Sequence, residues 1–291
     1  MPRIRYVDRN FSASSRALIK TAGKIIAEFA NQGYDLTLRQ LYYQFVSRAI
    51  ITNTERSYKR LGSIVNDARL TGLIDWHAII DRTRFLRKQP DWETPSDIVH
   101  GAARQYKIDR WANQDYRLEV WIEKDALIGV ISRVCDRWRV PYFSCRGYVS
   151  QSEMWRASQR MKMHVKERKD VIVIHLGDHD PSGMDMTRDI DDRLELFTNG
   201  AVEIERIALN MDQVQEYGPP PNPAKLTDAR CHKYIAEYGS SSWELDALEP
   251  RVMSELIEST IKKYVYVDAW KESGDREEDE RTKITALADS M

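Results

Sequence analysis

The chain has 291 residues, 42% of them hydrophobic and 31% charged, which is typical of a soluble globular protein with room for two domains. No segment approaches the roughly 18 to 20 apolar residues of a membrane span, and the first fifteen residues lack the apolar stretch of a signal peptide, so we expect a cytoplasmic protein without a membrane partner. The three cysteines, Cys135, Cys145 and Cys231, form no C-x-x-C pair and no even disulfide set, so we expect reduced, buried thiols.

Charge is divided unevenly along the chain. Residues 1–110 hold 19 Lys and Arg against 11 Asp and Glu, a net charge of +8, whereas residues 111–291 hold 25 against 34, a net charge of −9. Lysine and arginine neutralise phosphates, and clustered carboxylates collect hard cations. The division therefore suggests a nucleic-acid-binding part followed by a carboxylate-bearing part, although chance asymmetry of solvated charges gives the same division.

Three helices are predicted in the first 70 residues. The first, over residues 12–33, combines serine caps with regularly spaced apolar side chains. The second opens at Thr37, which forms a capping box with Gln40 three residues later. The third, over residues 54–70, is basic and is followed by an extended apolar piece, residues 73–80. This order is typical of a winged helix-turn-helix domain, although helical bundles that bind no DNA show the same pattern.

The pattern changes beyond residues 89–115, a proline-containing polar stretch predicted to connect two domains. Short β-rich runs then alternate with helical patterns, which predicts an α/β fold with a mainly parallel sheet and right-handed crossovers. Val171–Leu176 is almost wholly apolar, as in a strand buried on both faces. The predicted elements are strands at 118–122, 141–144 and 171–176, and helices at 126–138 and 152–169.

These patterns predict three parts of the chain. Residues 1–110 are assigned to the winged helix-turn-helix domain, which is mostly α. Residues 111–271 form the α/β domain, and its helical C-terminal part follows a proline-rich loop at Gly218–Pro223 that cannot be regular structure. Residues 272–291, dense in charge, are expected to be a frayed tail.

Acidic residues follow two of the predicted strands. Asp178 and Asp180 come directly after the buried strand, with Gly183 three residues later, and Glu123 ends the earlier strand. In an open α/β sheet, ligands bind beyond the carboxyl ends of the strands. Three carboxylates at one edge repel one another unless a cation lies between them, and magnesium prefers ligands that are all oxygen. We therefore expect Glu123, Asp178 and Asp180 to bind Mg²⁺.

The same residues resemble the Toprim signature. It consists of a glutamate at the end of a strand, here in Val120-Trp121-Ile122-Glu123-Lys124, and of D-x-D-x-x-G, here Asp178 to Gly183, so the resemblance covers roughly residues 115–215. It implies a Toprim α/β domain with magnesium-dependent phosphodiester chemistry, in which Glu123 is also catalytic. Toprim domains occur in topoisomerases, primases and nucleases, so this resemblance leaves the activity open.

A second motif narrows the choice. Arg39-Gln40-Leu41-Tyr42-Tyr43 resembles the R-x-x-Y-Y element of topoisomerase VI A subunits and of the eukaryotic meiotic break-forming protein, which share the domain order. The resemblance implies that Tyr43 attacks DNA. It also implies a homodimer in which the tyrosine of one protomer works with the metal of the other, and a separate ATP-binding B-like subunit for strand passage. The chain is similar to the compact Mini-A homologues, and Trp243–Leu248 looks like the acidic helix near the end of such subunits.

Helix geometry separates the two tyrosines. At about 100° per residue, Tyr42 falls on the apolar stripe of its helix, whereas Tyr43 projects roughly 130° from that stripe. Arg39 lies one turn before Tyr43, so its guanidinium is expected beside the phenol or beside the phosphate under attack. A nearby cation favours phenolate, which matters because the ordinary pKa of tyrosine is about 10. A tyrosine at an interface is the alternative for Tyr43.

Five basic residues are candidates for contacts with DNA. Lys59, Arg60 and Arg69 lie on the third helix, which is expected in the major groove. Lys124 and Arg146 flank the predicted carboxylate edge and are expected to hold the DNA backbone, with plain exposed charge as the alternative. His179 is expected to take no metal role, because imidazole suits zinc better than magnesium, and His175 is expected in the core.

Together these features predict magnesium-dependent breakage of double-stranded DNA, with possible rejoining, by a nucleoid-associated, topoisomerase VI A-like enzyme. Tyr43 forms a 5′-phosphotyrosyl link in this interpretation, and magnesium stabilises charge on the leaving oxygen. The sequence has no Walker A loop, so no ATP site is expected in this chain. Two alternatives stay open: a Toprim nuclease in which water attacks, and a catalytically silent DNA-binding protein.

Overall fold

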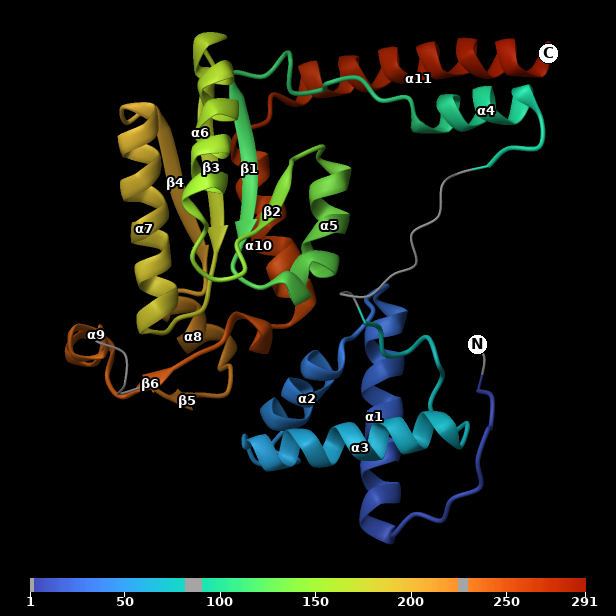
Figure 1. Ribbon diagram of the computed structural model, residues 1–291, viewed down its shortest axis with the longest axis vertical. Helices are drawn as coiled ribbons and strands as arrows, with labels where there is room; N and C mark the ends of the chain where they lie inside the picture. Colours follow the sequence, from blue (N-terminus) through green and yellow to red (C-terminus); the bar gives the residue numbers. More distant parts are fainter. Residues whose placement is uncertain (1–2, 82–90, 225–229) are drawn as a thin grey trace.

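The computed structural model describes residues 3–81, 91–224 and 230–291. Its N-terminal part consists of three helices around one apolar core (Figure 1). The side chains of Ser12, Thr37 and Thr54 accept hydrogen bonds from backbone N–H groups in the first turn of each helix, and Gln40 completes the predicted capping box. The three predicted helices are confirmed as α1 (Ala13–Asn31), α2 (Leu38–Ser47) and α3 (Glu55–Leu70).

The segment after α3 does not form the extended piece that the sequence predicts. Within the described residues 73–80, the backbone makes one isolated parallel bridge, between Leu36 and Ile79, and no regular strand. The predicted connection, 89–115, is also wrong in part. Its residues 89 and 90 lie outside the described residues, but Pro95–Gln105 forms the helix α4, whose capping box at Thr94 the sequence interpretation passed over.

The central part contains a parallel four-stranded sheet, which confirms the α/β fold class. The strand order is β2-β1-β3-β4, and every neighbouring pair in this sheet is parallel. Ile122, the last residue of β1, lies opposite Leu176, the last residue of β3, so the two strands end together. The strands are β1 (Tyr116–Ile122), β2 (Tyr142–Ser144), β3 (Asp170–Leu176) and β4 (Val202–Ala208).

Helices cover both faces of this sheet (Figure 1). The helices α5 (Ile128–Arg137) and α10 (Pro250–Lys263) pack on one face, where alternate side chains of β1 and β3 join them in an apolar core. The helices α6 (Gln151–Lys166) and α7 (Pro181–Thr198) form a second core on the other face. Burial on both faces explains why the central strands read as almost continuous apolar runs.

The described segments 209–224 and 230–248 lie below the carboxyl edge of the sheet (Figure 1). The predicted loop at Gly218–Pro223 is confirmed for its first four residues, but Asn222 and Pro223 pair with Ser242 and Ser241 in a short antiparallel ladder. Proline is tolerated there because the ladder is two residues long and has no further neighbour among the described residues. The elements are α8 (Met211–Tyr217), β5 (Asn222–Pro223), α9 (Cys231–Tyr238), β6 (Ser241–Ser242) and the 3₁₀ turns η1 (Asp125–Leu127) and η2 (Leu245–Ala247).

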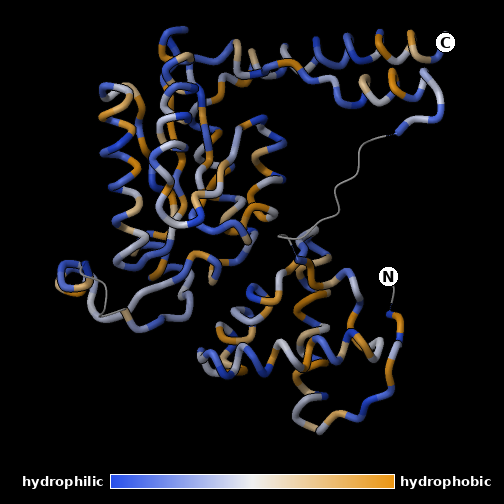
Figure 2. The backbone as a smooth tube through the Cα atoms, viewed as in Figure 1, coloured by the Kyte–Doolittle hydropathy of each residue, from blue (hydrophilic) through white to orange (hydrophobic). Residues whose placement is uncertain are grey.

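The expected frayed tail is wrong. Residues 272–291 belong almost entirely to one long helix, α11 (Val267–Asp289), which packs along α4 away from the sheet (Figure 1). Figure 2 shows this helix as largely hydrophilic. Composition predicted fraying, but the carboxylate of Glu277 has a partner that composition does not reveal. Its side chain is 1% exposed and bonds to Arg110 and Arg139 at 3.2 and 2.9 Å.

Glu277→Ala is therefore expected to destabilise the fold by about 3 kcal/mol, because it leaves a cluster of guanidinium groups without their shared buried carboxylate. The measurement is the free energy of unfolding in urea. Glu278→Ala is the matched control, because Glu277 and Glu278 both pair with Arg281. The Glu278 side chain is 67% exposed, so the effect of its removal should stay within about 0.5 kcal/mol. Equal losses in the two variants would contradict the role given to Glu277.

Two further expectations, on membrane spans and on the cysteines, came from the composition of the chain. None of the helices in the described parts of the chain combines the length and the apolar character that crossing a bilayer requires. Cys135, Cys145 and Cys231 are buried and unpaired, as expected. Burial raises the pKa of the Cys135 and Cys145 thiols to about 12, so both remain protonated at neutral pH.

Candidate active site

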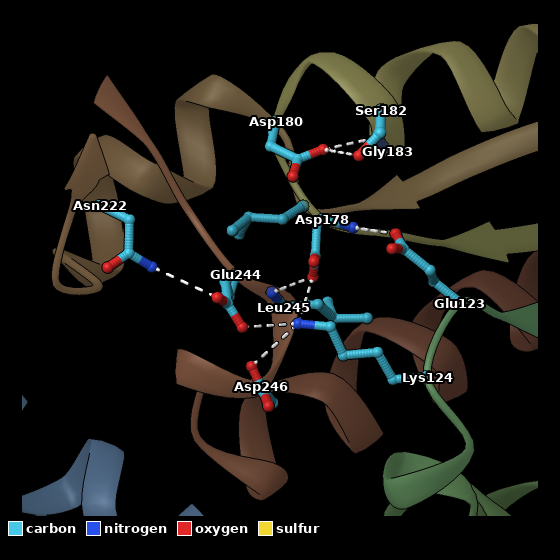
Figure 3. Close-up of polar contacts among 12 residues, drawn as sticks. Glu123, Lys124, Asp178, Asp180, Ser182, Gly183, Asn222, Glu244, Leu245 and Asp246 are labelled. Carbon is cyan, nitrogen blue, oxygen red and sulfur yellow. Dashed lines mark hydrogen bonds and ion pairs between the residues drawn. The ribbon is translucent and has the colours of Figure 1, made fainter. Parts of the chain in front are cut away.

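The predicted acids meet at the carboxyl edge of the sheet (Figure 3). Glu123 follows β1 and Asp178 follows β3, and because these strands are neighbours, the backbone N–H of Asp178 donates to Glu123 Oε2 at 2.8 Å. Asp180 lies two residues further and caps α7, its Oδ1 accepting from the backbone N–H of Gly183 at 2.6 Å and from Ser182 Oγ at 2.8 Å. The structure thus confirms that Glu123 and Asp178 come together, with Asp180 in the same loop.

The acids do not form a ready magnesium cage as they lie. Within the described ranges, no three His, Cys, Asp or Glu side chains are grouped so that they could hold a metal ion. Their oxygens have other partners: Asp178 Oδ1 accepts from the backbone N–H of Leu245 at 2.8 Å and pairs with Lys124 Nζ at 2.9 Å. The donor set is all oxygen and suits Mg²⁺ chemically, but the three carboxylates are not grouped around one position, and Lys124 pairs with Asp178.

Burial disfavours the ionised forms of Asp178 and Glu123. The pKa of Asp178 is raised to about 7 by burial, and by the neighbouring carboxylates of Glu123 and Asp246, with Lys124 opposing the shift. The pKa of Glu123 is also raised, first by burial. A further positive charge beside this loop would stabilise both ionised forms.

Arg206 stabilises the loop between β3 and α7, residues 177–180, which carries Asp178 and Asp180 and is called the acid-bearing loop below. Its guanidinium, from β4, donates to the backbone oxygens of Gly177, Asp178 and Gly183 at 3.1, 2.8 and 3.2 Å. Burial lowers its pKa to about 10, which still leaves it charged at neutral pH. The sequence interpretation missed this residue because no local pattern marks a cation that binds backbone oxygens across the sheet.

His179 points away from the acids, as the alternation of a strand ending in a turn allows. Its Nδ1 lies 2.7 Å from the Tyr234 hydroxyl, and its ring is surrounded by Tyr234, Tyr238 and Trp243. His175 is buried in the core, as expected, with Nδ1 3.0 Å from Thr187 Oγ1.

The predicted separation of the two tyrosines of α2 is wrong. Tyr42 and Tyr43 are 4% and 5% exposed, and both belong to the apolar core of the N-terminal helices. The Tyr42 hydroxyl donates to Asn53 Oδ1 at 2.9 Å. Tyr43 is buried because α2 has a second neighbour: η2, from residues far along the chain, covers that side of the helix, and Ala247 joins the same core. Helical periodicity detects one apolar stripe but not a second contact made by a distant segment.

Arg39 accompanies Tyr43, but its effect on the phenol is outweighed. The guanidinium carbon lies 5.8 Å from the centre of the Tyr43 ring, and Arg39 pairs with Asp246 at 2.7 Å and with Glu244. The pKa of Tyr43 is raised well above its usual value, first by burial and then by the carboxylates of Asp246 and Glu244. Arg39 does favour the phenolate, as expected, but burial and the two carboxylates outweigh it.

Glu244 and Asp246 are site residues that the sequence interpretation did not identify. They lie at η2, a single 3₁₀ turn, so the acidic helix expected at Trp243–Leu248 is also wrong. Lys124 Nζ lies 2.9 Å from Glu244 Oε2 and 3.1 Å from Asp246 Oδ1 (Figure 3). Two acids spaced two residues apart in an apolar segment were the available signal.

One pocket joins these groups. A cavity of about 360 Å³ is lined by Arg39 and Tyr43 of α2, by Asp178 and Asp180 of the acid-bearing loop, and by Glu244. Among the described residues that line it, Arg39 is the one cation, whereas Glu55 adds a fourth carboxylate. The pocket brings the predicted nucleophile and two predicted metal ligands of one chain together, and carboxylates outnumber cations in the lining described.

The candidate DNA-binding residues are not all brought to this pocket. Lys124 reaches the acids, whereas Arg146 is exposed and pairs with Asp125 at 3.1 Å. Lys59 and Arg60 are exposed on α3. Arg69 donates a hydrogen bond to the backbone oxygen of Trp76 at 2.8 Å, and its guanidinium lies over the indole ring of Trp76.

The fold and the site define an α/β protein with a helical N-terminal part. Its acidic pocket is lined both by the N-terminal helices and by the loops at the carboxyl edge of the sheet. No protein-family model matches the chain, and no curated protein sequence matches it. Function is therefore inferred from the geometry and chemistry of the pocket.

Proposed function

We propose that this protein breaks double-stranded DNA by transesterification, with Tyr43 as the nucleophile, in the manner of the topoisomerase VI A subunits it resembles. In this proposal the N-terminal helices act as the winged helix-turn-helix domain and the sheet with its acids acts as the Toprim domain. One observation carries the proposal: Arg39 and Tyr43 line the same pocket as Asp178 and Asp180, although more than 130 residues separate the two pairs.

The proposed reaction is a transesterification at phosphorus. The phenol oxygen of Tyr43 forms a bond to phosphorus, the bond to the 3′ oxygen breaks, and the result is a 5′-phosphotyrosyl link and a 3′ hydroxyl. The phenol gives its proton to solvent, and the leaving oxygen takes one. Arg39, next to the phenol, holds the phosphate, and Lys124 lies beside the acids to bind the DNA backbone.

Magnesium is part of the proposal because the pocket is acidic. A phosphodiester entering a space lined by four carboxylates and one guanidinium meets repulsion that an added cation relieves. Glu123, Asp178 and Asp180 would hold the ion, which supplies charge stabilisation at the leaving oxygen when bound. Breaking both strands requires two copies of Tyr43, so the active form is a homodimer on the duplex, and strand passage requires a separate ATP-binding B-like subunit.

A hydrolytic nuclease is the second candidate, and a specific observation favours it. Tyr43 is 5% exposed and its pKa is raised, which is unfavourable for a nucleophile. Water beside Asp178 and Asp180 needs no such phenol. The two candidates predict different products, a covalent protein–DNA adduct and a free 5′ phosphate.

The deciding experiment uses labelled duplex incubated with the protein and Mg²⁺, then denatured and digested so that covalently attached label stays on the protein. We expect labelled protein that disappears in Tyr43→Phe and when magnesium is omitted. Tyr42→Phe is the matched control, because the neighbouring phenol is equally buried, and it should keep the adduct.

Three other results decide against transesterification by Tyr43. Cleavage that persists in Tyr43→Phe and stops in Asp178→Ala identifies the nuclease. An adduct that survives in Tyr43→Phe moves the nucleophile elsewhere. Binding without cleavage, with or without a B-like partner, identifies a silent DNA-binding protein.

A further inference from the structure

Arg39, which lines the pocket, and Lys124, which lies beside it, both pair with Glu244 and Asp246. Arg39 pairs through Nε with Asp246 Oδ2 at 2.7 Å and through a terminal nitrogen with Glu244. Lys124 Nζ lies 2.9 Å from Glu244 Oε2 and 3.1 Å from Asp246 Oδ1. Each carboxylate thus contacts both cations. DNA phosphates bind arginine and lysine through the same kind of charge-assisted hydrogen bond.

This contact is built between parts of the chain that are distant in sequence. Arg39 comes from α2 of the N-terminal helices, and Lys124 follows β1 (Figures 1 and 3). Glu244 directly precedes η2, and Asp246 lies within it. The Asp246 side chain is 2% exposed, so its charge is compensated by the two cations rather than by water. An ion pair exposed on both sides would be worth little, but here the Asp246 carboxylate is buried. The Arg39 side chain is 47% exposed, so a phosphate can approach it from solvent.

The same contact keeps the reactive groups from substrate and metal. Lys124 also pairs at 2.9 Å with Oδ1 of Asp178, one of the predicted metal ligands. Tyr43 is covered by η2, and its neighbour Arg39 is engaged by carboxylates rather than free for a phosphate. Nucleophile, phosphate-binding cation and metal ligand are therefore all engaged by groups of the protein itself.

We infer that Glu244 and Asp246 act as an internal phosphate mimic, which occupies Arg39 and Lys124 in the resting protein and gives way to the DNA backbone when duplex binds. The inference rests on the proposed function for the identity of the ligand. It adds an autoinhibitory contact that holds a DNA-breaking site closed until DNA phosphates compete for its cations.

The test is the affinity of the double variant Glu244→Gln/Asp246→Asn for a fluorescein-labelled duplex, measured by anisotropy without divalent ions so that cleavage does not interfere. We expect roughly tenfold tighter binding than that of the wild type, because the two cations become available. The salt dependence should also steepen: the slope of log K against log salt should become more negative by about 2, one unit for each new phosphate contact.

The control variant is Glu205→Gln/Glu258→Gln, which removes two carboxylates that also pair with cations but lie outside the pocket. Their side chains are 25% exposed and pair with Lys263 and Lys262 at 2.7 and 3.1 Å. Its affinity and slope should match those of the wild type. Equal gains in both double variants would mean a general charge effect, and no gain in Glu244→Gln/Asp246→Asn would overturn the inference.

A second measurement needs no variant and so does not depend on its folding. A carbodiimide, which joins contacting ammonium and carboxylate groups, should couple Lys124 to Glu244 or Asp246 in the wild type, as mass spectrometry of peptides would show. Adding duplex should reduce this product and leave the Lys263–Glu205 product unchanged. If duplex binds and the Lys124 product persists, the phosphate mimic is wrong while the proposed function stands; if no duplex binds at all, the proposed function itself fails.

Discussion

Replacing Gly183 with alanine is expected to destabilise the protein by about 3 kcal/mol or more, because the added methyl group has no space in the folded state. A Cβ at this position would lie 2.2 Å from the backbone oxygen of Asp178 and 2.9 Å from its carbonyl carbon. Both are backbone atoms, so no side-chain rotation relieves the clash. The start of α7 would have to move away from the acid-bearing loop, which breaks the cap that Asp180 forms with the Gly183 N–H.

Urea unfolding measures this loss, and a second glycine provides the control. Gly23 lies inside α1, where an added Cβ meets nothing within 4 Å. Gly23→Ala should therefore stabilise the protein by about 0.5 to 1 kcal/mol, since alanine is the better helix former. A loss in Gly183→Ala below 1 kcal/mol would show that the loop and α7 can separate easily, and would remove the reason given for glycine at this place in the motif.

Much of the fold was predictable because its determinants are local in sequence. The capping box of Thr37 and Gln40 and the apolar run of β3 each specify an element from a few neighbouring residues. The juxtaposition of Glu123 and Asp178 was predictable as well, since neighbouring parallel strands end at one edge of the sheet.

The largest error in the fold, the tail expected to be frayed, comes from partners that are distant in sequence. The charged stretch at 272–291 is a helix because it packs against α4 and because Glu277 binds arginines from residues 110 and 139. Neither contact leaves a local trace, and composition alone favours a disordered segment. Tertiary packing overrides composition here in the same way that it overrides helix propensity elsewhere.

The candidate site was predictable in its chemistry but not in its electrostatics. Tyr43, Arg39, Asp178 and Asp180 were identified from motifs and line the pocket, whereas Glu123 lies beside it, bonded to Asp178. The sequence does not show that η2 buries the phenol, or that Glu244 and Asp246 neutralise Arg39, because that requires knowing which distant segment covers α2. The net effect on the Tyr43 pKa is consequently opposite to the one expected from Arg39 alone.

His175 is expected to make the protein progressively less stable in mild acid. Its ring is 1% exposed, and its pKa is lowered from 6.5 to about 3, first by burial and second by the charge of Arg206. Between pH 6.5 and pH 3, His175 is therefore protonated in the unfolded chain but neutral in the folded protein. The stability contributed by the neutral ring is complete above pH 6.5 and is lost as the pH falls towards 3, at about 1.4 kcal/mol per pH unit.

The variant His175→Gln isolates this contribution, since glutamine does not titrate and its amide can still hydrogen-bond to Thr187, the present partner of Nδ1. Urea unfolding at several pH values should give the wild type a steeper loss of stability than the variant, amounting to roughly 3 kcal/mol between pH 6.5 and pH 4. Any packing defect in the variant lowers its stability equally at every pH, so the difference in slope reports the proton alone. Parallel curves would mean that the ring accepts a proton in the folded state, and that the strand behind the acid-bearing loop is more accessible to water than its burial indicates.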